Sequence, residues 1–192
     1  MCELLLSAVL ALPFEAKDGS LMDFFRFLKK RKKVEPKRYD LAGPEVTDLV
    51  TDVCSTLRMQ FNFLENSVSG VPPIVQERTK DGHPIVDRWL SGYLSGFYDA
   101  FSQHRGYAFE FNALELIYCV FYGEEDAAAA VHEYHMARKS LASDKEAAYL
   151  FGFDEFEEGM MAGGNNFVAW LQKEIKYPLG IYKKYSSPSS EA

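Results

Sequence analysis

The chain of 192 residues is long enough for one domain with a sizeable core and short for two. Its 47% hydrophobic content, with 15 Phe, 11 Tyr and 2 Trp, excludes a globally disordered protein. The formal net charge of -7 is unevenly distributed, because residues 26–38 hold eight of the 21 Lys and Arg residues and only one acid. The other positions carry 13 basic against 27 acidic residues, a net charge of -14, which repels nucleic acid and anionic lipid and attracts basic proteins.

The first 38 residues differ in character from the rest of the chain. Residues 1–14 are apolar but lack the positive charge that begins a signal peptide, and they are too short to span a bilayer. They are predicted to dock as a first helix; a start of the protein at Met22 is the alternative. Residues 21–28 carry apolar side chains at helical spacing, and Pro36 ends the helix that they predict.

The basic run in this first segment is open to several interpretations. Together with the preceding phenylalanines it could lie on an anionic membrane surface through residues 21–33, serve as a nuclear import signal, or contact nucleic-acid phosphates. The remaining interpretation is a solvated linker, which could also neutralise the acidic face of the same protein. The cationic side chains concerned are Arg26, Lys29, Lys30, Arg31, Lys32 and Lys33.

Long helices are predicted for the first half of the body. Pro44 fits a first helical position, and apolar residues follow at helical spacing to Leu64, where a Ser, Gly and Pro-rich stretch ends the helix. After a polar loop, residues 84–102 show a second apolar face. Residues 107–111 are interpreted as an extended lead-in and not as part of a sheet.

Helices also account for the second half. Asn112 is the predicted N-cap of a helix that Gly123 interrupts, and residues 124–139 have acids in the first turn and bases in the last. Ser143 and Glu146 form a predicted capping box for a helix through residue 162. Gly163 and Gly164 are expected to end it, with Asn165 or Asn166 capping a last helix before a loose C-terminal tail.

The fold class predicted from these elements is all-α, a single-domain bundle of about six or seven helices. The predicted organisation is an N-terminal apolar and basic segment (1–38), an acidic helical domain (39–182) and a flexible tail (183–192). Residues 93–101 and 149–157 share the pattern Tyr-Leu-x-Gly-Phe, which suggests two related helix hairpins with Gly96 and Gly152 at close approaches of the backbone. Gly92 and Gly96 also form a GxxxG pattern, on a helix too charged to be a membrane dimer face.

Catalytic chemistry has little support in the sequence. His132 and His135 share a helical face with Glu125, which makes them weak candidates for a divalent metal site and for a metal-dependent helical enzyme. Phosphate-binding loops and nucleophile elbows are absent from the sequence, and no cofactor is expected. The three cysteines have no CxxC spacing, so neither disulfides nor a thiolate zinc site is predicted, and a reducing cytoplasm fits.

The function expected from composition is therefore protein binding without catalysis. An inhibitor or immunity-like module, or an adaptor, would engage a basic protein partner through an acidic helical surface with aromatic anchors. The alternatives are the metal-dependent enzyme and a peripheral membrane protein held by residues 21–33; nucleic acid is not expected to bind the acidic body. The predicted partner-binding residues are Asp99, Asp154, Glu155, Glu157, Glu158, Tyr98 and Phe156, with Trp170 as a further candidate anchor.

Overall fold

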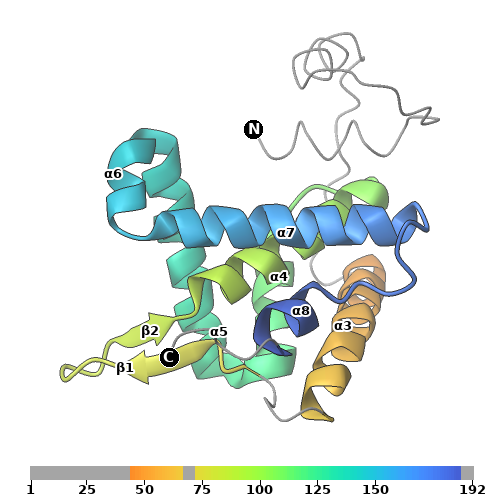
Figure 1. The fold of residues 1–192 in the computed structure, drawn as a ribbon, viewed down its shortest axis with the longest axis horizontal. Coiled ribbons are helices and arrows are strands. Elements are labelled where there is room, and N and C mark those ends of the chain that lie inside the picture. Colours follow the sequence, from red (N-terminus) through yellow and green to blue (C-terminus); the bar gives the residue numbers. More distant parts are fainter. Residues whose placement is uncertain (1–43, 67–71, 187–192) are drawn as a thin grey trace, which may run out of the picture.

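A computed structural model describes residues 44–66 and 72–186 (Figure 1). The described part contains a two-stranded antiparallel hairpin and six helices, so the prediction of an all-α bundle is confirmed. The predictions for the first 43 residues and for residues 187–192 lie outside the described residues. The elements are α3 (Pro44–Glu65), β1 (Val75–Arg78), β2 (Pro84–Val86), α4 (Arg88–His104), α5 (Phe111–Ser143), α6 (Lys145–Leu150), α7 (Phe153–Leu171) and α8 (Gly180–Ser186).

Helix α4 forms the centre of the molecule. Every residue from Trp89 to Ser102 is buried, which requires neighbours on all sides of the helix. The chain runs in the same direction along α7 and α4 where the two helices cross, and α3 and α5 pack on other sides of α4 (Figure 1). Buried polar groups are usually hydrogen-bonded, and in α4 the hydroxyls of Ser91 and Ser95 both lie within hydrogen-bond distance of the Tyr118 hydroxyl.

The crossing of α4 and α7 brings the two backbones into contact. A Cβ atom at Gly92 would lie 2.2 Å from the carbonyl oxygen of Phe156, and one at Gly96 would lie 2.0 Å from that of Met160. These distances are far below van der Waals contact, so only glycine fits at both positions. The GxxxG pattern of the sequence therefore marks a close helix crossing inside a bundle.

Helix α7 contributes the same arrangement to its side of the crossing. Cβ atoms at Gly159 and Gly163 would each lie 2.1 Å from a carbonyl oxygen of α4, that of Trp89 and that of Tyr93 respectively. The two glycine pairs are related by a local twofold symmetry, because each helix places its glycines under the carbonyls of the other. The predicted equivalence of Gly96 with Gly152 is wrong, since Gly152 has positive φ and faces only the Arg88 side chain.

The close crossing also explains why the predicted end of a helix at Gly163 and Gly164 is wrong. Both glycines are buried inside α7, which continues to Leu171, so Asn165 and Asn166 are interior residues of one helix. The chain breaks earlier, at Gly152, whose φ of 77° separates α6 from α7. Gly152 thus ends a helix, whereas Gly163 and Gly164 pack inside one.

Several predicted boundaries moved by a few residues. Asp144, not Ser143, caps α6 by accepting a hydrogen bond from the Ala147 amide at 3.0 Å. Helix α5 begins one residue before Asn112, and Gly123 interrupts it with φ 80° as predicted. Residues 84–86 are not helical, because they pair with β1 and the buried Asp87 caps α4.

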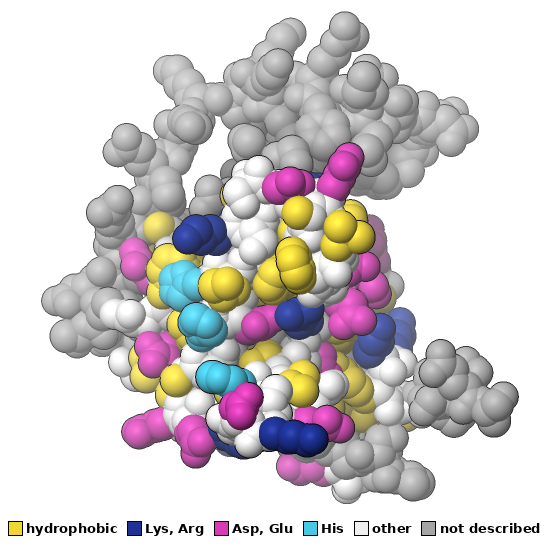
Figure 2. Space-filling view, turned by 90° about the vertical axis from the view of Figure 1, so that its left-hand side faces the viewer, with side chains coloured by type: hydrophobic (Ala, Val, Ile, Leu, Met, Phe, Trp, Pro, Cys, Tyr) yellow, Lys and Arg dark blue, Asp and Glu magenta, His cyan; other side chains and the backbone are white. Residues whose placement is uncertain are grey.

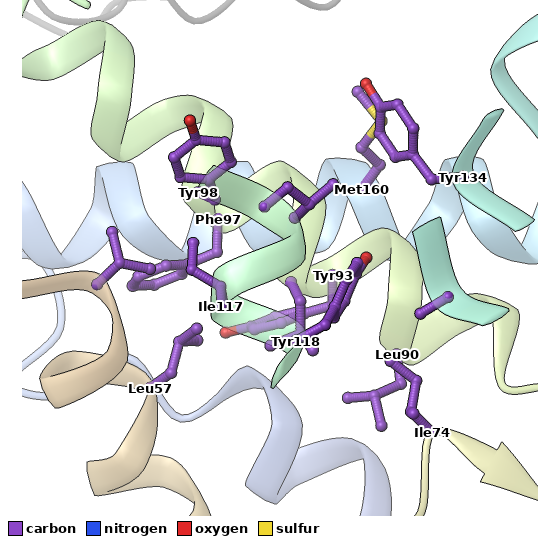
Figure 3. Close-up of a cluster of buried hydrophobic side chains, with 14 of the residues drawn as sticks. Leu57, Ile74, Leu90, Tyr93, Phe97, Tyr98, Ile117, Tyr118, Tyr134 and Met160 are labelled. Atoms are coloured by element: carbon purple, nitrogen blue, oxygen red, sulfur yellow. The ribbon is translucent and has the colours of Figure 1, made fainter. Parts of the chain in front are cut away.

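Helices α3 and α5 cover the sides of α4 that α7 leaves free. Figure 3 shows Leu57 of α3 and Ile117 and Tyr118 of α5 beside Tyr93 and Phe97 of α4. The Tyr118 hydroxyl donates to the Ser91 carbonyl at 2.9 Å inside this core. Burial raises the pKa of Tyr118 to about 12, although hydrogen bonds to Ser91 and Ser95 oppose the shift.

Helix α8 is fixed at its start by side chains of α3 and α7. The Ile181 amide donates to Gln60 Oε1 and the Gly180 amide donates to Asn166 Oδ1, both at 3.0 Å. Farther along, the Tyr185 hydroxyl donates to Asp87 at 2.7 Å. Residues 183–186, placed in the C-terminal tail from sequence, are therefore part of a packed helix.

Replacing Gly96 with alanine tests the crossing. Alanine favours a helix over glycine by about 1 kcal/mol. The methyl group would nevertheless collide with the Met160 carbonyl, and such overpacking costs typically 1–3 kcal/mol or more. The free energy of unfolding, measured in urea, is expected to fall. Asn165→Ala, at an exposed position of α7, is the control and should change it by less than about 0.5 kcal/mol. Unchanged stability of Gly96→Ala would contradict the close crossing.

Candidate functional site

Helix α7 has an inner and an outer face. Phe153, Phe156 and Met160 recur every three to four residues and are buried against α4 and α5. The residues between them point away from the core, and Asp154, Glu155 and Glu158 are exposed. The helical period therefore separates the predicted acidic surface from the aromatic residues that interrupt it.

The aromatic anchors predicted from sequence are not on the surface. Tyr98 and Phe156 are both fully buried, so their assignment as exposed partner-binding residues is wrong. The Tyr98 hydroxyl donates to the Glu110 carbonyl at 3.2 Å, which holds the extended lead-in to α5. Phe156 packs against Tyr134 of α5, and Trp170 is half-buried beside Phe167.

Asp99 is also buried, which removes it from the predicted acidic surface. Its carboxylate accepts a hydrogen bond from Gln103 Nε2 at 3.0 Å, one turn later on α4. It lines a cavity of about 220 Å³ together with His135, Arg138 and a wall of aromatic rings. The carboxylate thus belongs to the interior of the bundle.

Glu157 joins α6 to α7. Its carboxylate accepts hydrogen bonds from Lys145 at 2.9 Å and from the Tyr149 hydroxyl. Burial acts to raise the pKa of Glu157, but these two hydrogen bonds outweigh it and leave the pKa below its ordinary value. A carboxylate with a lowered pKa stabilises the fold above its unfolded pKa and loses that contribution as the pH falls through its folded pKa.

Among the described residues, the two most exposed large hydrophobic side chains, Leu150 and Phe151, lie at the corner between α6 and α7. Leu150 is 87% exposed, Phe151 is 70% exposed and Tyr149 is 41% exposed, and we call these three residues the corner patch. Figure 2 shows hydrophobic side chains next to acidic ones at the end of the molecule that carries α6. Leaving Leu150 and Phe151 in water forgoes about 1.5–3 kcal/mol each of burial free energy.

The corner patch was not predicted from the sequence, although a signal for it was present. Residues 147–151 form an unbroken run of Ala, Tyr, Leu and Phe, and a helix that packs on one face cannot bury every member of such a run. The break at Gly152 then decides which residues are left outside. Ala148 faces the core, whereas Leu150 and Phe151 face solvent.

Arg88 contacts the backbone and the neighbouring residues of the corner patch. Its Nε donates to Glu133 of α5 at 2.5 Å, and its Nη1 donates to the Phe151 carbonyl. The guanidinium also lies 4.5 Å from the centre of the Phe153 ring. One side chain at the start of α4 therefore ties α5 to the corner between α6 and α7.

A polar cleft of about 320 Å³ lies next to Arg88, between β2, α4, α5 and α7. Three carboxylates line it, from Asp87, Glu133 and Glu155, against the one guanidinium of Arg88. The Asp87 carboxylate already accepts hydrogen bonds from the Leu90 amide and from the side chains of Gln76 and Tyr185. Glu133 forms an ion pair with Arg88. In residues 44–66 and 72–186, Glu155 forms no ion pair, which leaves it as the carboxylate of the cleft that a cationic group could meet.

The candidate metal ligands are not brought together. Glu125 accepts a hydrogen bond from Arg78 at 2.8 Å, and the ring of His135 packs on Phe111 at 4.5 Å between centroids. His132 is exposed. Within residues 44–66 and 72–186, no group of three or more His, Cys, Asp or Glu side chains could hold a metal ion.

The described cysteines have the environment of structural residues. Cys54 is buried, and this burial raises the pKa of its thiol to about 11 against the opposing effect of Arg58. Cys119 is also a free thiol whose pKa is raised, by burial and by the neighbouring Glu115 and Glu124. A thiol with a raised pKa is a poor nucleophile at neutral pH.

The basic residues Arg26, Lys29, Lys30, Arg31, Lys32 and Lys33 lie outside the described residues. Among the helices that are described, none has the length and apolar character needed to cross a membrane. No protein-family model matches the chain, and comparison with curated proteins and with solved structures gives no match.

Replacing Arg88 with alanine tests the support of the corner. The change leaves Glu133 without its partner and the Phe151 carbonyl without its donor, so the free energy of unfolding should fall by about 1–3 kcal/mol. Hydrogen exchange should quicken in residues 149–153. Arg105→Ala breaks a more exposed ion pair with Asp52 and serves as the control, with an expected loss below about 1 kcal/mol. Equal losses in the two variants would show that Arg88 does not hold the corner.

Proposed function

We propose that this chain is a non-catalytic protein-binding module that engages a basic partner through the corner patch and the outer face of α7. The observation that carries the proposal is the position of Leu150 and Phe151, two strongly exposed apolar residues directly before a row of exposed acids. An inhibitor or immunity-like module, or an adaptor, is the class of protein that this surface suits.

The two kinds of residue have different tasks in such an interface. Interface affinity comes mostly from a few apolar or aromatic anchors that become desolvated, and Leu150 and Phe151 are suited to that task. The charges of Asp154, Glu155 and Glu158 act at longer range, because complementary fields speed the encounter of partners more than they strengthen the complex. Glu158 also accepts a hydrogen bond from Trp89 Nε1 at 3.1 Å, which orients it.

The cleft beside Arg88 supports a cationic partner. Glu155 lines the cleft without an ion pair among the described residues. The carboxylates of Asp87 and Glu133 line the same cleft and make the surroundings of Glu155 acidic. A lysine or arginine side chain entering this cleft would meet Glu155 while its alkyl stem lay along Pro84 and Ile85. Such an arrangement favours recognition of basic protein surfaces.

Capture of a partner by the full chain from its native host tests the anchors. Leu150→Ala with Phe151→Ala should lower the affinity for the captured protein about tenfold or more, because both residues lose the area that a partner would bury. Leu116→Ala with Val120→Ala is the control, since these residues are 48% and 47% exposed on α5, outside the corner patch. Equal affinity of the two double variants would exclude the corner patch as the binding surface.

Association kinetics test the acids of α7. Neutralising Asp154, Glu155 and Glu158 as Asn, Gln and Gln should lower the association rate about tenfold at low salt and change the dissociation rate less. Asp81→Asn with Glu115→Gln and Glu174→Gln removes the same charge from exposed positions elsewhere and should have a smaller effect. If the two triple variants associate equally fast, net charge and not the face of α7 steers the partner.

A further inference from the structure

The corner patch and the basic segment of the chain have complementary chemistry. The patch joins exposed apolar residues to the acids of α7, and residues 24–33 join Phe24, Phe25, Phe27 and Leu28 to six cationic side chains. Phenylalanines would cover Leu150 and Phe151 while lysines and arginines met the carboxylates. The segment therefore carries both features that the proposed function requires of a partner.

The chain between the two regions is long enough to join them. Ten residues, 34–43, lie between Lys33 and the start of α3 at Pro44, and the eleven steps from Cα to Cα across them span at most about 36–40 Å when extended. The 19 residues of α7 make a helix about 28 Å long. Asp52 of α3 pairs with Arg105 at the C-terminal end of α4, whereas the corner patch directly precedes the start of α7 (Figure 1). The extended connection is longer than α7 itself.

We infer that residues 24–33 dock on the corner patch and the outer face of α7 of the same chain and compete there with the protein partner. The competition rests on the proposed function, whereas the docking itself does not. A tethered segment acts at an effective concentration in the millimolar range, so even a weak contact is well populated. A partner must then displace the segment, and its apparent affinity is reduced by the fraction of chains in which the patch is free.

Limited proteolysis of the full chain tests the docking. Trypsin cleaves after Lys and Arg, so the initial rate of cleavage within residues 26–33, followed by mass spectrometry, reports how accessible the segment is. This rate is normalised to that of a free peptide of residues 24–38. The natural chain should be cleaved more slowly than the peptide, and the protection should weaken in 1 M salt, where charges are screened beyond about 3 Å but apolar contacts are not.

Two variants identify the surface that protects the segment. Neutralising Asp154, Glu155 and Glu158 should speed the cleavage at least about threefold, because three exposed ion pairs are lost. Leu150→Ala with Phe151→Ala should also speed it. The matched control is the triple variant at Asp81, Glu115 and Glu174, which should be cleaved like the natural chain.

The outcomes separate the docking from the proposed function. Cleavage of the natural chain at the rate of the free peptide would overturn the docking and leave partner capture to be judged by the corner variants alone. Protection that grows with protein concentration would assign the contact to a second copy and overturn the intramolecular contact. If the segment is protected from trypsin but no captured protein needs the corner patch for binding, the docking is supported and the proposed function is excluded.

Discussion

The fold depends on the contact between the backbones of α4 and α7. Two glycines of each helix lie under carbonyl oxygens of the other, so the helices approach as closely as their main chains allow. This approach buries one face of α4 and fixes the rotation of both helices about their axes, because only one face of each is free of side chains. The rest of the bundle, including α3, α5 and α8, packs around a pair whose geometry has little freedom.

The rotation of α7 also decides what the surface offers. Once Gly159 and Gly163 face α4, Phe153 and Phe156 must follow them inward, and the acids between them must point outward. The left-handed backbone of Gly152 separates α6 from α7, and the end of α6 is exposed in the part of the chain that the structure describes. The proposed binding surface is thus a consequence of the same crossing that makes the core.

A surface built in this way joins a small apolar centre to an acidic border. The apolar residues would supply affinity and the acids would supply the rate of encounter, and neither task requires a catalytic group. Occupation of this surface by the basic segment of the chain would shield the apolar residues from water until a partner arrives. The same contact would neutralise part of the acidic charge. It would thereby explain why the basic residues of the sequence cluster in one segment while the rest of the chain is acidic.

The sequence by itself determined the helical class, the long apolar stripe of α3 and the interruption at Gly123, because these follow from periodicity and from the conformational freedom of glycine. It also indicated a close approach at Gly96. Only the tertiary structure decided that Gly163 and Gly164 continue a helix and that Tyr98 and Phe156 are buried, since a glycine or an aromatic ring has the same local signal in either setting. Which face of a helix meets another helix depends on residues distant in the chain, and that is why the exposed corner at Leu150 and Phe151 emerged only from the packed structure.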